Sequence, residues 1–268
     1  MKILYAAAEI APFTRMTHTA DLLRFLPASL QDKGFEIRIL LPKYGTINDR
    51  RNRLHEVIRL SGIEVEVGEK VESMRIKVAS IPNAKLQVYF LDNDLYFKRK
   101  GLFRDPKKET WYDDNDQRLV FYNKGVLETV MKLGWEPDII HCHDWPAGLI
   151  PLLVRTKYKD EAIFKKTKIV YNLHHAENHG KFNSSSILKM LGLPDDVDID
   201  KLTENGITDM LRVGLAYSDH VVTGNHLSDE FDSLFKELKI NPTKIQGSPE
   251  DVSTKFAEYY QEIAGSAE

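Results

Sequence analysis

The sequence predicts an α/β fold in which a doubly wound parallel sheet is followed by a C-terminal helix. Two observations support this prediction: the chain opens with a strand, a helix and a second strand, and its second half repeats strands and helices in turn. A third is a helix-start signature near the C-terminus. Sheets of this class bind ligands at the carboxyl ends of their strands, so the loops that follow the strands are the expected place for a site.

The first forty residues predict a βαβ unit. The apolar run Lys2–Ala8 is typical of a strand, and apolar residues at helical spacing predict a helix over 20–33, with Gly34 as its C-terminal cap. The run 35–41 predicts a second strand, which Pro42 ends. Such units normally build a parallel sheet.

The middle of the chain changes pattern. The segments 63–67, 74–78 and 86–91 alternate polar and apolar residues, which predicts strands with one solvated face. The polar, aromatic stretch 92–114 is interpreted as a long surface loop, a kind of segment that is usually functional or mobile. A helix over 115–133, stopped by Gly134, follows it.

The second half alternates buried-type strands with helices. The predicted elements are a strand over 138–142, a helix over 145–158, a strand over 168–173, a helix over 203–217, a strand over 220–223 and a helix that ends at Leu238.

The C-terminal segment predicts an amphipathic helix. Ser248 is a suitable N-cap, Pro249 suits the first helical position, and Asp251 places an acidic residue at the third. Simple packing of this helix on the domain is the favoured interpretation; covering a docking face or recruiting a partner are the alternatives. No repeat or Gly/Ser linker is visible, so we expect one domain over 1–240, followed by a linker and the helix over 241–268.

Composition excludes several classes of protein. With 42% hydrophobic residues, 29% charged residues and a net charge of -3 over 268 residues, the chain is typical of a globular protein. No run is long and apolar enough for a membrane span, and 37 basic against 40 acidic residues give no general field for nucleic acid. The single Cys142 cannot form an internal disulfide, and Glu9 comes too early for a signal peptide. We therefore expect a cytoplasmic protein that binds neither nucleic acid nor membrane.

The loop after the first strand is the expected place for a phosphate. It contains Arg15 as its only fixed positive charge and has no glycine over 14–21, so the fingerprint of a dinucleotide site is absent. A plain surface loop is an equally good interpretation.

The strand end His141-Cys142-His143-Asp144-Trp145 contains candidate sugar-binding residues. A carboxylate beside an indole suits a sugar, because the acid accepts hydrogen bonds from hydroxyls and the ring packs on the C–H face. The alternative is that Asp144 caps the next helix and Trp145 belongs to the core.

Three histidines and a glutamate follow the next strand, in the segment His174-His175-Ala176-Glu177-Asn178-His179. A metal site is conceivable, but the H-E-x-x-H pattern is absent and Gly180 favours a loop, so we expect no bound metal. Cys142 is expected to be a small buried hydrophobe rather than a nucleophile.

Taken in order, these segments resemble the N-terminal domain of bacterial glycogen synthases and plant starch synthases. These are ADP-glucose-dependent retaining glucosyltransferases with two Rossmann-like domains, the GT-B type. The resemblance covers residues 1–235. It rests on the segments 2–13, Leu91-Asp92-Asn93 with Tyr96-Phe97, Gly101-Leu102-Phe103, 113–118 and 141–145, the last similar to the family's His-Ala-His-Asp-Trp.

The resemblance implies transfer of glucose from ADP-glucose to the non-reducing end of an α-1,4-glucan, with no required metal or other cofactor. It places His174 beside the transferred glucose. The other roles that it implies are contact with sugar for Tyr96, Asp144 and Trp145, acidic residues flanking the donor loop for Glu9 and Asp21, and a cation facing the diphosphate for Arg15.

The sequence departs from the family in the donor loop and in length. The family's Lys-Thr-Gly-Gly-Leu is Arg15-Met16-Thr17-His18-Thr19 here, so the charge is kept while both glycines are lost; bulk is added where backbone approaches phosphate, and a positive φ there becomes costly. The family's nucleotide-gripping C-terminal domain has no counterpart in these 268 residues. We therefore expect glucosyl transfer to need a separate C-terminal domain, with a non-catalytic α-glucan-binding or regulatory module as the alternative.

Overall fold

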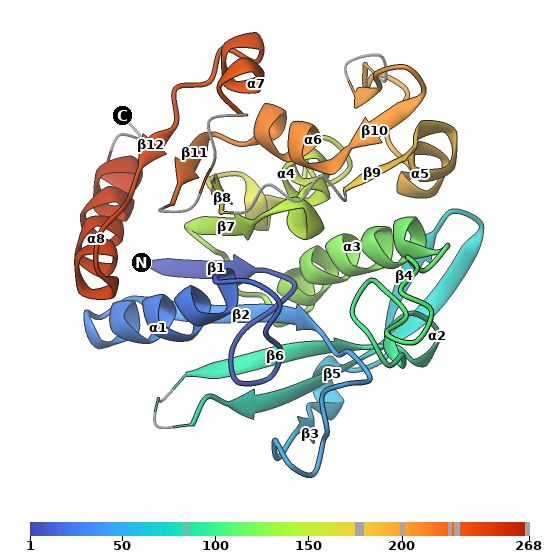
Figure 1. Cartoon of the computed structure of the whole chain (residues 1–268), viewed down its shortest axis with the longest axis horizontal. Coiled ribbons are helices and arrows are strands. Elements are labelled where there is room, and N and C mark those ends of the chain that lie inside the picture. The colour runs from blue at the N-terminus through green and yellow to red at the C-terminus, as the bar shows by residue number, and fades with distance from the viewer. Residues whose placement is uncertain are drawn as a thin grey trace.

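The fold was analysed in a computed structural model. The structure describes residues 1–82, 84, 86–174, 180–198, 202–224, 227 and 231–265. Its centre is one large sheet with the strand order β12-β11-β8-β7-β1-β2-β6-β5-β3, and β4 pairs with β5 beside this path (Figure 1). The strands from β12 to β6 run parallel, and β5 is antiparallel to β6. The predicted doubly wound α/β sheet is confirmed.

The strands of the sheet differ greatly in length, and both ends of the strand order are two-residue strands. Their bounds are β1 Lys2–Ala6, β2 Glu36–Pro42, β3 His55–Glu56, β4 Ile63–Val67, β5 Lys70–Ser80, β6 Gln87–Asp92, β7 Ile139–His143, β8 Lys168–Leu173, β11 His220–Thr223 and β12 Thr243–Lys244. A separate hairpin joins β9 Lys181–Asn183 and β10 Ile207–Asp209.

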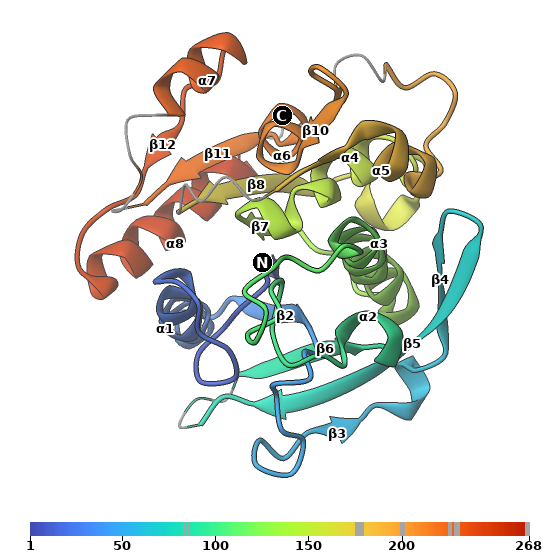
Figure 2. The same ribbon diagram turned by 45° about the vertical axis from the view of Figure 1, so that its right-hand side comes forward.

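Helices cover both faces of the sheet (Figures 1 and 2). Helices α1 and α8 lie side by side on one face, and α3, α4 and α6 cover the other. The bounds of the α-helices are α1 Thr19–Asp32, α2 Asp94–Phe97, α3 Asn115–Leu133, α4 Leu149–Arg155, α5 Ser184–Leu191, α6 Met210–Tyr217, α7 Asp232–Glu237 and α8 Pro249–Gly265.

The order of the strands reverses between β1 and β7. From β1 the chain builds outward through β2 and β6, and from β7 it builds the other way through β8 and β11. Loops that follow β1 and β7 therefore diverge at this point, which is where a doubly wound sheet opens a crevice for a ligand.

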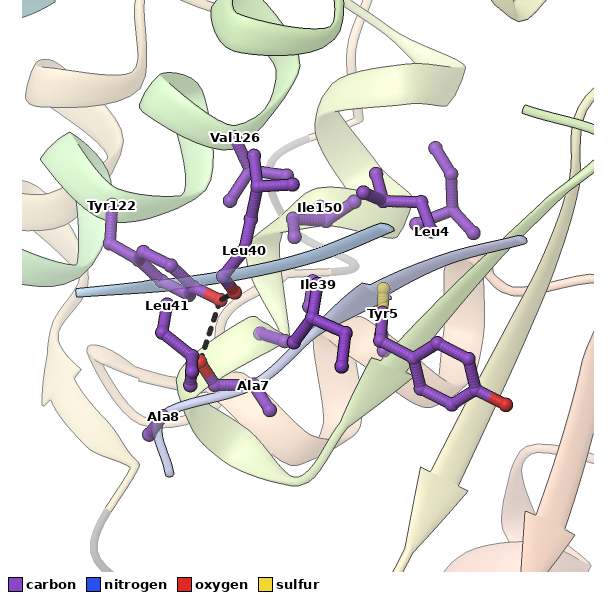
Figure 3. Close-up of a cluster of buried hydrophobic side chains, with 14 of the residues drawn as sticks. Leu4, Tyr5, Ala7, Ala8, Ile39, Leu40, Leu41, Tyr122, Val126 and Ile150 are labelled. Atoms are coloured by element: carbon purple, nitrogen blue, oxygen red, sulfur yellow. Dashed lines mark hydrogen bonds between the residues drawn. The ribbon is translucent and has the colours of Figure 1, made fainter. Parts of the chain in front are cut away.

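The core alternates across the sheet with the period of two that strands impose. Leu4 and Leu40 lie with residues of α3 and α4, whereas Tyr5 points to the opposite side (Figure 3). The hydroxyl of Tyr122 on α3 lies 2.8 Å from the carbonyl oxygen of Ala7 and 2.9 Å from that of Leu40. This contact fixes α3 to the ends of β1 and β2, directly beneath the loop that leaves β1.

Several predicted elements are confirmed with the same bounds or nearly so. Helix α3 spans Asn115–Leu133 and ends at Gly134 with a positive φ of 59°, and strands β8 and β11 have the predicted bounds. Helix α8 begins after Ser248, whose hydroxyl accepts from the N–H of Asp251 while the Asp251 carboxylate accepts from the N–H of Ser248. This reciprocal pair is the predicted N-terminal signature.

The stretch 92–114 is the predicted surface loop only in part, since residues 104 and 106–110 are irregular and exposed whereas other parts of it are buried. It contains helix α2, and its aromatic side chains Phe97 and Phe103 are buried. The buried guanidinium of Arg118 lies 5.8 and 5.7 Å from the centres of these two rings. The prediction failed for Phe97 and Phe103 because these rings pack on the Arg118 cation of the following helix, α3, instead of facing water.

Two predicted helices are shorter than expected. The segment predicted over 145–158 is a 3₁₀ turn, Trp145–Ala147, followed by α4; Gly148 between them lies so close to α6 that a Cβ there would be 2.2 Å from the carbonyl oxygen of Met210. The segment predicted over 203–217 contains a hairpin turn at Asn205-Gly206, both with positive φ, before α6 begins. Such an Asn-Gly pair is a hairpin signal that outweighed the helical spacing of its neighbours.

The C-terminal segment belongs to the same fold. Strand β12 pairs with β11, and α8 packs against α1, with the Ser29 and Ser253 hydroxyl oxygens 2.6 Å apart. Phe256 and Tyr260 of α8 are almost fully buried. Helix α8 therefore packs on its own domain.

Candidate functional site

The candidate site lies at the carboxyl ends of β1, β7, β8 and β11. The loop 7–18 follows β1, Asp144 follows β7, His174 follows β8 and Gly224 follows β11. Because these strands are parallel neighbours, their ends meet at one edge of the sheet, next to the N-terminus of α1.

Asp144 joins three of these elements through its carboxylate. Its Oδ1 accepts the backbone N–H of His174 at 2.8 Å, and its Oδ2 accepts the hydroxyl of Thr19, the first residue of α1, at 3.2 Å. The Asp144 side chain makes no capping bond to its own 3₁₀ turn. The capping alternative is therefore not what the structure shows. The residue has φ 53° and ψ -175°, a region that costs a non-glycine residue of order 1–3 kcal/mol and is held by its surroundings.

Glu9 fastens the loop between β1 and α1. Its carboxylate accepts hydrogen bonds from the backbone N–H groups of Met16 and Thr17 and from the hydroxyl of Thr17. Burial raises the pKa of Glu9, and the bonds from Thr17 and Met16 act in the opposite direction. The backbone N–H groups of Met16 and Thr17 are therefore both engaged by Glu9.

Arg15 and Asp21 form an ion pair on the surface of the same loop. The guanidinium and carboxylate lie 2.5 Å apart, and their side chains are 63% and 50% exposed. Exposed pairs of this kind are weak, typically below about 1 kcal/mol, so an anionic ligand can compete for Arg15.

The lost glycines impose no backbone strain on the donor loop. His18 has φ -64° and ψ -20°, and none of residues 14–19 has a positive φ. The Thr17 hydroxyl in addition accepts the N–H of Thr19 at 3.1 Å at the start of α1. The loop thus avoids the positive φ that these side chains would make costly, and the bulk that they add remains.

A cavity of about 570 Å³ opens beside this loop. One wall is polar and includes Arg15 and His174, and the other is apolar and comes partly from the C-terminal segment. Arg15 is the only lysine or arginine among the described residues that line it. The full lining is Arg15, Met16, Thr17, His18, Thr19, Asp21, Leu22, Asn172, His174, Gly224, Ile245, Val252 and Phe256.

A second, smaller cavity of about 70 Å³ adjoins the first on the other side of Thr17 and Thr19. Three aromatic rings surround it: the centre of the Trp145 ring lies 4.6 Å from that of Phe103 and 6.1 Å from that of Trp111. Glu9 and Asp144 also line it. Trp145 is 8% exposed, so its two interpretations are compatible: the ring packs in the core and still presents an edge to the cavity.

Tyr96 does not join the other candidate residues. It is 1% exposed, its ring packs 4.8 Å from that of Phe121, and its carbonyl oxygen accepts from the guanidinium of Arg118. Neither cavity is lined by it. Direct contact between Tyr96 and a sugar, as the resemblance implied, is therefore not supported, because the side chain is enclosed by α2 and α3.

A row of buried histidine and tyrosine side chains leads to His174. The hydroxyl of Tyr260 lies 2.5 Å from Nδ1 of His141 and 3.0 Å from the hydroxyl of Tyr5. The rings of His141 and His143 are 4.1 Å apart, and Nδ1 of His143 lies 3.0 Å from Nε2 of His174. Burial lowers the pKa of His141 and of His143 well below the ordinary value, so both rings are neutral.

Several residues of the site were missed in the sequence. Asn172 lines the larger cavity from inside β8, and its Oδ1 is buried without a partner in the described part of the chain. Gly224 makes room for His174, since a Cβ there would lie 3.0 Å from its Nδ1. Asn172 and Gly224 lie at the carboxyl ends of their strands, where a ligand site is expected in this fold. Nothing in the local sequence indicates that Val252 and Phe256 of α8 reach this cavity.

Other expectations concern metal, membrane and thiol chemistry. Among the described residues no group of three or more potential ligands could hold a metal ion; His175–His179, which suggested one, lie outside them. No helix in the described ranges is long and apolar enough to cross a membrane. Cys142 is fully buried in β7, and burial raises the pKa of its thiol, as expected for a structural residue.

Comparison with known proteins identifies relatives over most of the chain. The glycogen synthase of Chlorobaculum parvum is 45% identical over 223 residues, which are 83% of this chain and 45% of that protein. The glycogen synthase of Chlorobium luteolum is 45% identical over 228 residues, 84% of this chain and 46% of that protein. The chain thus spans about half the length of the curated relatives that it matches.

A solved structure shares the fold. The catalytic domain of starch synthase IV from Arabidopsis thaliana, bound to ADP and acarbose, superposes with a TM-score of 0.74 at 21% identity and covers 91% of this chain and 51% of that one. The family described as the starch synthase catalytic domain matches residues 2–227. On this match, which covers most of the sequence, the chain belongs to the starch synthase catalytic domain family, to which the N-terminal halves of glycogen synthases are homologous.

Proposed function

We propose that this chain provides the acceptor-side half of an ADP-glucose-dependent glucosyltransferase that extends an α-1,4-glucan. In this reaction the bond from C1 of glucose to the diphosphate breaks, and C1 forms a bond to the 4-hydroxyl of the glucan end, whose proton is released. Residues 1–240 form the acceptor-side domain, and 241–268 form the linker and terminal helix that complete it.

The observation that carries this proposal is the pair of adjacent cavities at the strand ends. The larger contains Arg15 and His174, and the smaller contains Asp144 and Trp145, with the start of α1 between them. One cavity offers a cation for a diphosphate, and the other offers a carboxylate and aromatic rings for a sugar. The solved relative with the same fold was bound to ADP and acarbose, which supports a nucleotide and a glucan as the two ligands.

The charge in the larger cavity is the reason to propose a second domain. Arg15 is the only fixed cation among its described lining residues, and it is paired with Asp21. A leaving diphosphate develops more negative charge than one exposed guanidinium can stabilise. A C-terminal glycosyltransferase domain, supplied separately, would provide the remaining positive charge, so we expect little or no activity from these 268 residues alone.

The test is incorporation of labelled glucose from ADP-glucose into glycogen. The chain is assayed alone and with the separately expressed C-terminal half of the Chlorobaculum parvum glycogen synthase, which is the half that this chain does not match. Transfer that appears only with both halves, and that His174→Ala abolishes while Lys189→Ala on the exposed side of α5 does not, is the expected result. Absence of transfer with this half and with every candidate C-terminal domain would contradict the proposal.

A non-catalytic α-glucan-binding or regulatory module is the second candidate. It is favoured by Glu9, which occupies the backbone N–H groups of Met16 and Thr17 that would otherwise be free to meet a phosphate. The smaller cavity, which would hold sugar, keeps its carboxylates and aromatic rings.

Calorimetric titration separates the two candidates. The chain is titrated with a maltooligosaccharide and with ADP-glucose, each with and without the C-terminal half. Binding of glucan without any binding of the nucleotide, even when both halves are present, would favour the module. Binding of both supports the transferase.

A further inference from the structure

His143 and His174 are joined in a way that family membership does not explain. Nδ1 of His143 lies 3.0 Å from Nε2 of His174, and the two rings are parallel within 2°, with centres 5.3 Å apart. His143 is in β7 and His174 follows β8, so the bond connects neighbouring strand ends. At its other end is the ring of His174, which lines the larger cavity.

His143 cannot turn away from this contact. Its ring is stacked on that of Tyr5, with centres 5.6 Å apart, and also lies 4.1 Å from that of His141. His141 is itself held by the hydroxyl of Tyr260 on α8. His143 is 1% exposed and neutral, so its ring carries one proton, which sits either on Nδ1 or on Nε2.

The surroundings of Nε2 of His143 decide which of its two ring nitrogens carries the proton. This nitrogen is buried and has no hydrogen-bond partner among the residues that the structure describes. A buried N–H group without an acceptor is rarer and less favourable than a buried nitrogen that lacks a donor. The proton is therefore expected on Nδ1, where it is donated to Nε2 of His174.

We propose that His143 is a positioning residue that holds His174 as the tautomer protonated on Nδ1. Since Nε2 of His174 accepts the bond from His143, the single proton of a neutral His174 ring must be on Nδ1. That nitrogen is on the side of Gly224, which lines the same cavity. At that nitrogen His174 is thus a hydrogen-bond donor and not an acceptor. That an oxygen of a sugar nucleotide receives this bond rests on the proposed function; the tautomer itself does not.

The first test is a measurement on the unliganded protein. Long-range ¹H–¹⁵N correlation spectra of ¹⁵N-labelled protein show which ring nitrogen of each neutral histidine carries the proton, and the signals of His174 are assigned by their loss in His174→Gln. The expected result is protonation on Nδ1 of His174 and on Nδ1 of His143. Protonation of His174 on Nε2 would overturn the proposal, whatever the activity of the protein.

Two variants of His143 separate positioning from packing. His143→Asn keeps an N–H donor near the position of Nδ1, whereas His143→Leu keeps apolar bulk and removes the donor. We expect His174 to remain protonated on Nδ1 in His143→Asn and to become a mixture of tautomers in His143→Leu. An unchanged tautomer in a folded His143→Leu protein contradicts the proposal. If that variant does not fold, the spectra of the wild-type protein and His143→Asn decide alone.

Ligand affinity gives a second, independent readout. With the C-terminal half present, the KM for ADP-glucose should rise about tenfold in His143→Leu, as for one lost hydrogen bond, and much less in His143→Asn. An equal rise in both variants would show that His143 acts through packing only. Absence of transfer even in the wild-type protein would contradict the proposed function and leave the tautomer measurement as it stands.

Discussion

The carboxylate of Asp144 accepts the backbone N–H of His174 at 2.8 Å and ties the ends of β7 and β8 together. The same carboxylate accepts the hydroxyl of Thr19 at 3.2 Å, which places the start of α1 against both strands. One side chain thus sets the spacing of three elements that line the two cavities. Its removal should affect stability and sugar binding together.

Asp144→Ala is expected to lower the free energy of unfolding by about 1–3 kcal/mol, because the N–H of His174 loses its acceptor in a partly buried place. Urea unfolding measures this loss, and calorimetric titration should show weaker binding of maltooligosaccharide. Asp144→Asn is the matched control, since its amide oxygen can still accept from His174. Equal losses in both variants would mean that the negative charge, and not the hydrogen bond, carries the effect.

Tyr260→Phe should destabilise the protein although it removes one oxygen atom only. The hydroxyl lies between His141 and Tyr5 in the core, so its loss leaves buried polar groups without a partner, at about 1–3 kcal/mol. Tyr259→Phe, next to it on α8 but only partly buried, should change the midpoint of urea unfolding much less. If Tyr260→Phe is as stable as the wild-type protein, the row of buried rings does not hold α8 in place.

The stability of the protein should rise with pH above about 8 through Lys124. Its Nζ donates to the carbonyl oxygens of Glu66 and Met190 at 2.9 Å each, and burial lowers its pKa to about 8. The unfolded chain, with the ordinary value of 10.5, binds more protons between about pH 8 and 10.5, so the free energy of unfolding increases across this interval. The difference between the pKa values of Lys124 in the folded and unfolded protein corresponds to roughly 3 kcal/mol of unfolding free energy when it is fully expressed.

Lys124→Met provides the comparison for this effect. The other lysines and tyrosines titrate alike in both proteins, so the difference in unfolding free energy, wild type minus variant, isolates Lys124. This difference should grow from pH 8 to pH 10.5 and stay constant below pH 8, where Lys124 is charged in both states. A difference that does not change with pH would show that Lys124 keeps an ordinary pKa in the folded protein.

Restoring glycines in the donor loop should strengthen nucleotide binding. Thr17→Gly with His18→Gly removes two side chains that line the larger cavity and the hydroxyl that binds Glu9. We expect tighter binding of ADP in calorimetric titration, together with a loss of about 1–2 kcal/mol in stability, because the loop gains freedom in the unfolded state and loses its bond to Glu9. The single variant Met16→Ala, in the same loop, is the control. Unchanged ADP affinity in the double variant would show that the lost glycines do not limit binding.

Local sequence signals were sufficient for much of the fold. Strand β8 and helix α3 were predicted with their bounds, since each has a clear period and, for α3, a glycine stop. The hairpin at Asn205-Gly206 was missed because helical spacing nearby was given more weight than the turn pair. The burial of Phe97 and Phe103 depends on Arg118, which contacts these rings only through the tertiary fold.

The candidate site was predictable in some of its residues and not in its bonds. Asp144 and His174 stand out as polar residues at strand ends, but the hydrogen bond between them joins positions thirty residues apart. The burial of Tyr96 was not foreseen, because a motif gives the identity of a residue and not its burial. The contribution of α8 to the larger cavity comes from a segment beyond residues 2–227, where the family match gives no guidance.

The two-residue strands β3 and β12, which stand at the ends of the strand order, also bear on how the protein behaves when concentrated. Each offers only a short row of backbone groups along its outer side, and the residues of both strands are exposed and include charged side chains. A strand from another molecule would gain few hydrogen bonds by pairing there. The sheet is thereby protected at both ends of this order against edge-to-edge aggregation, even though its central strands are long runs of apolar, β-prone residues.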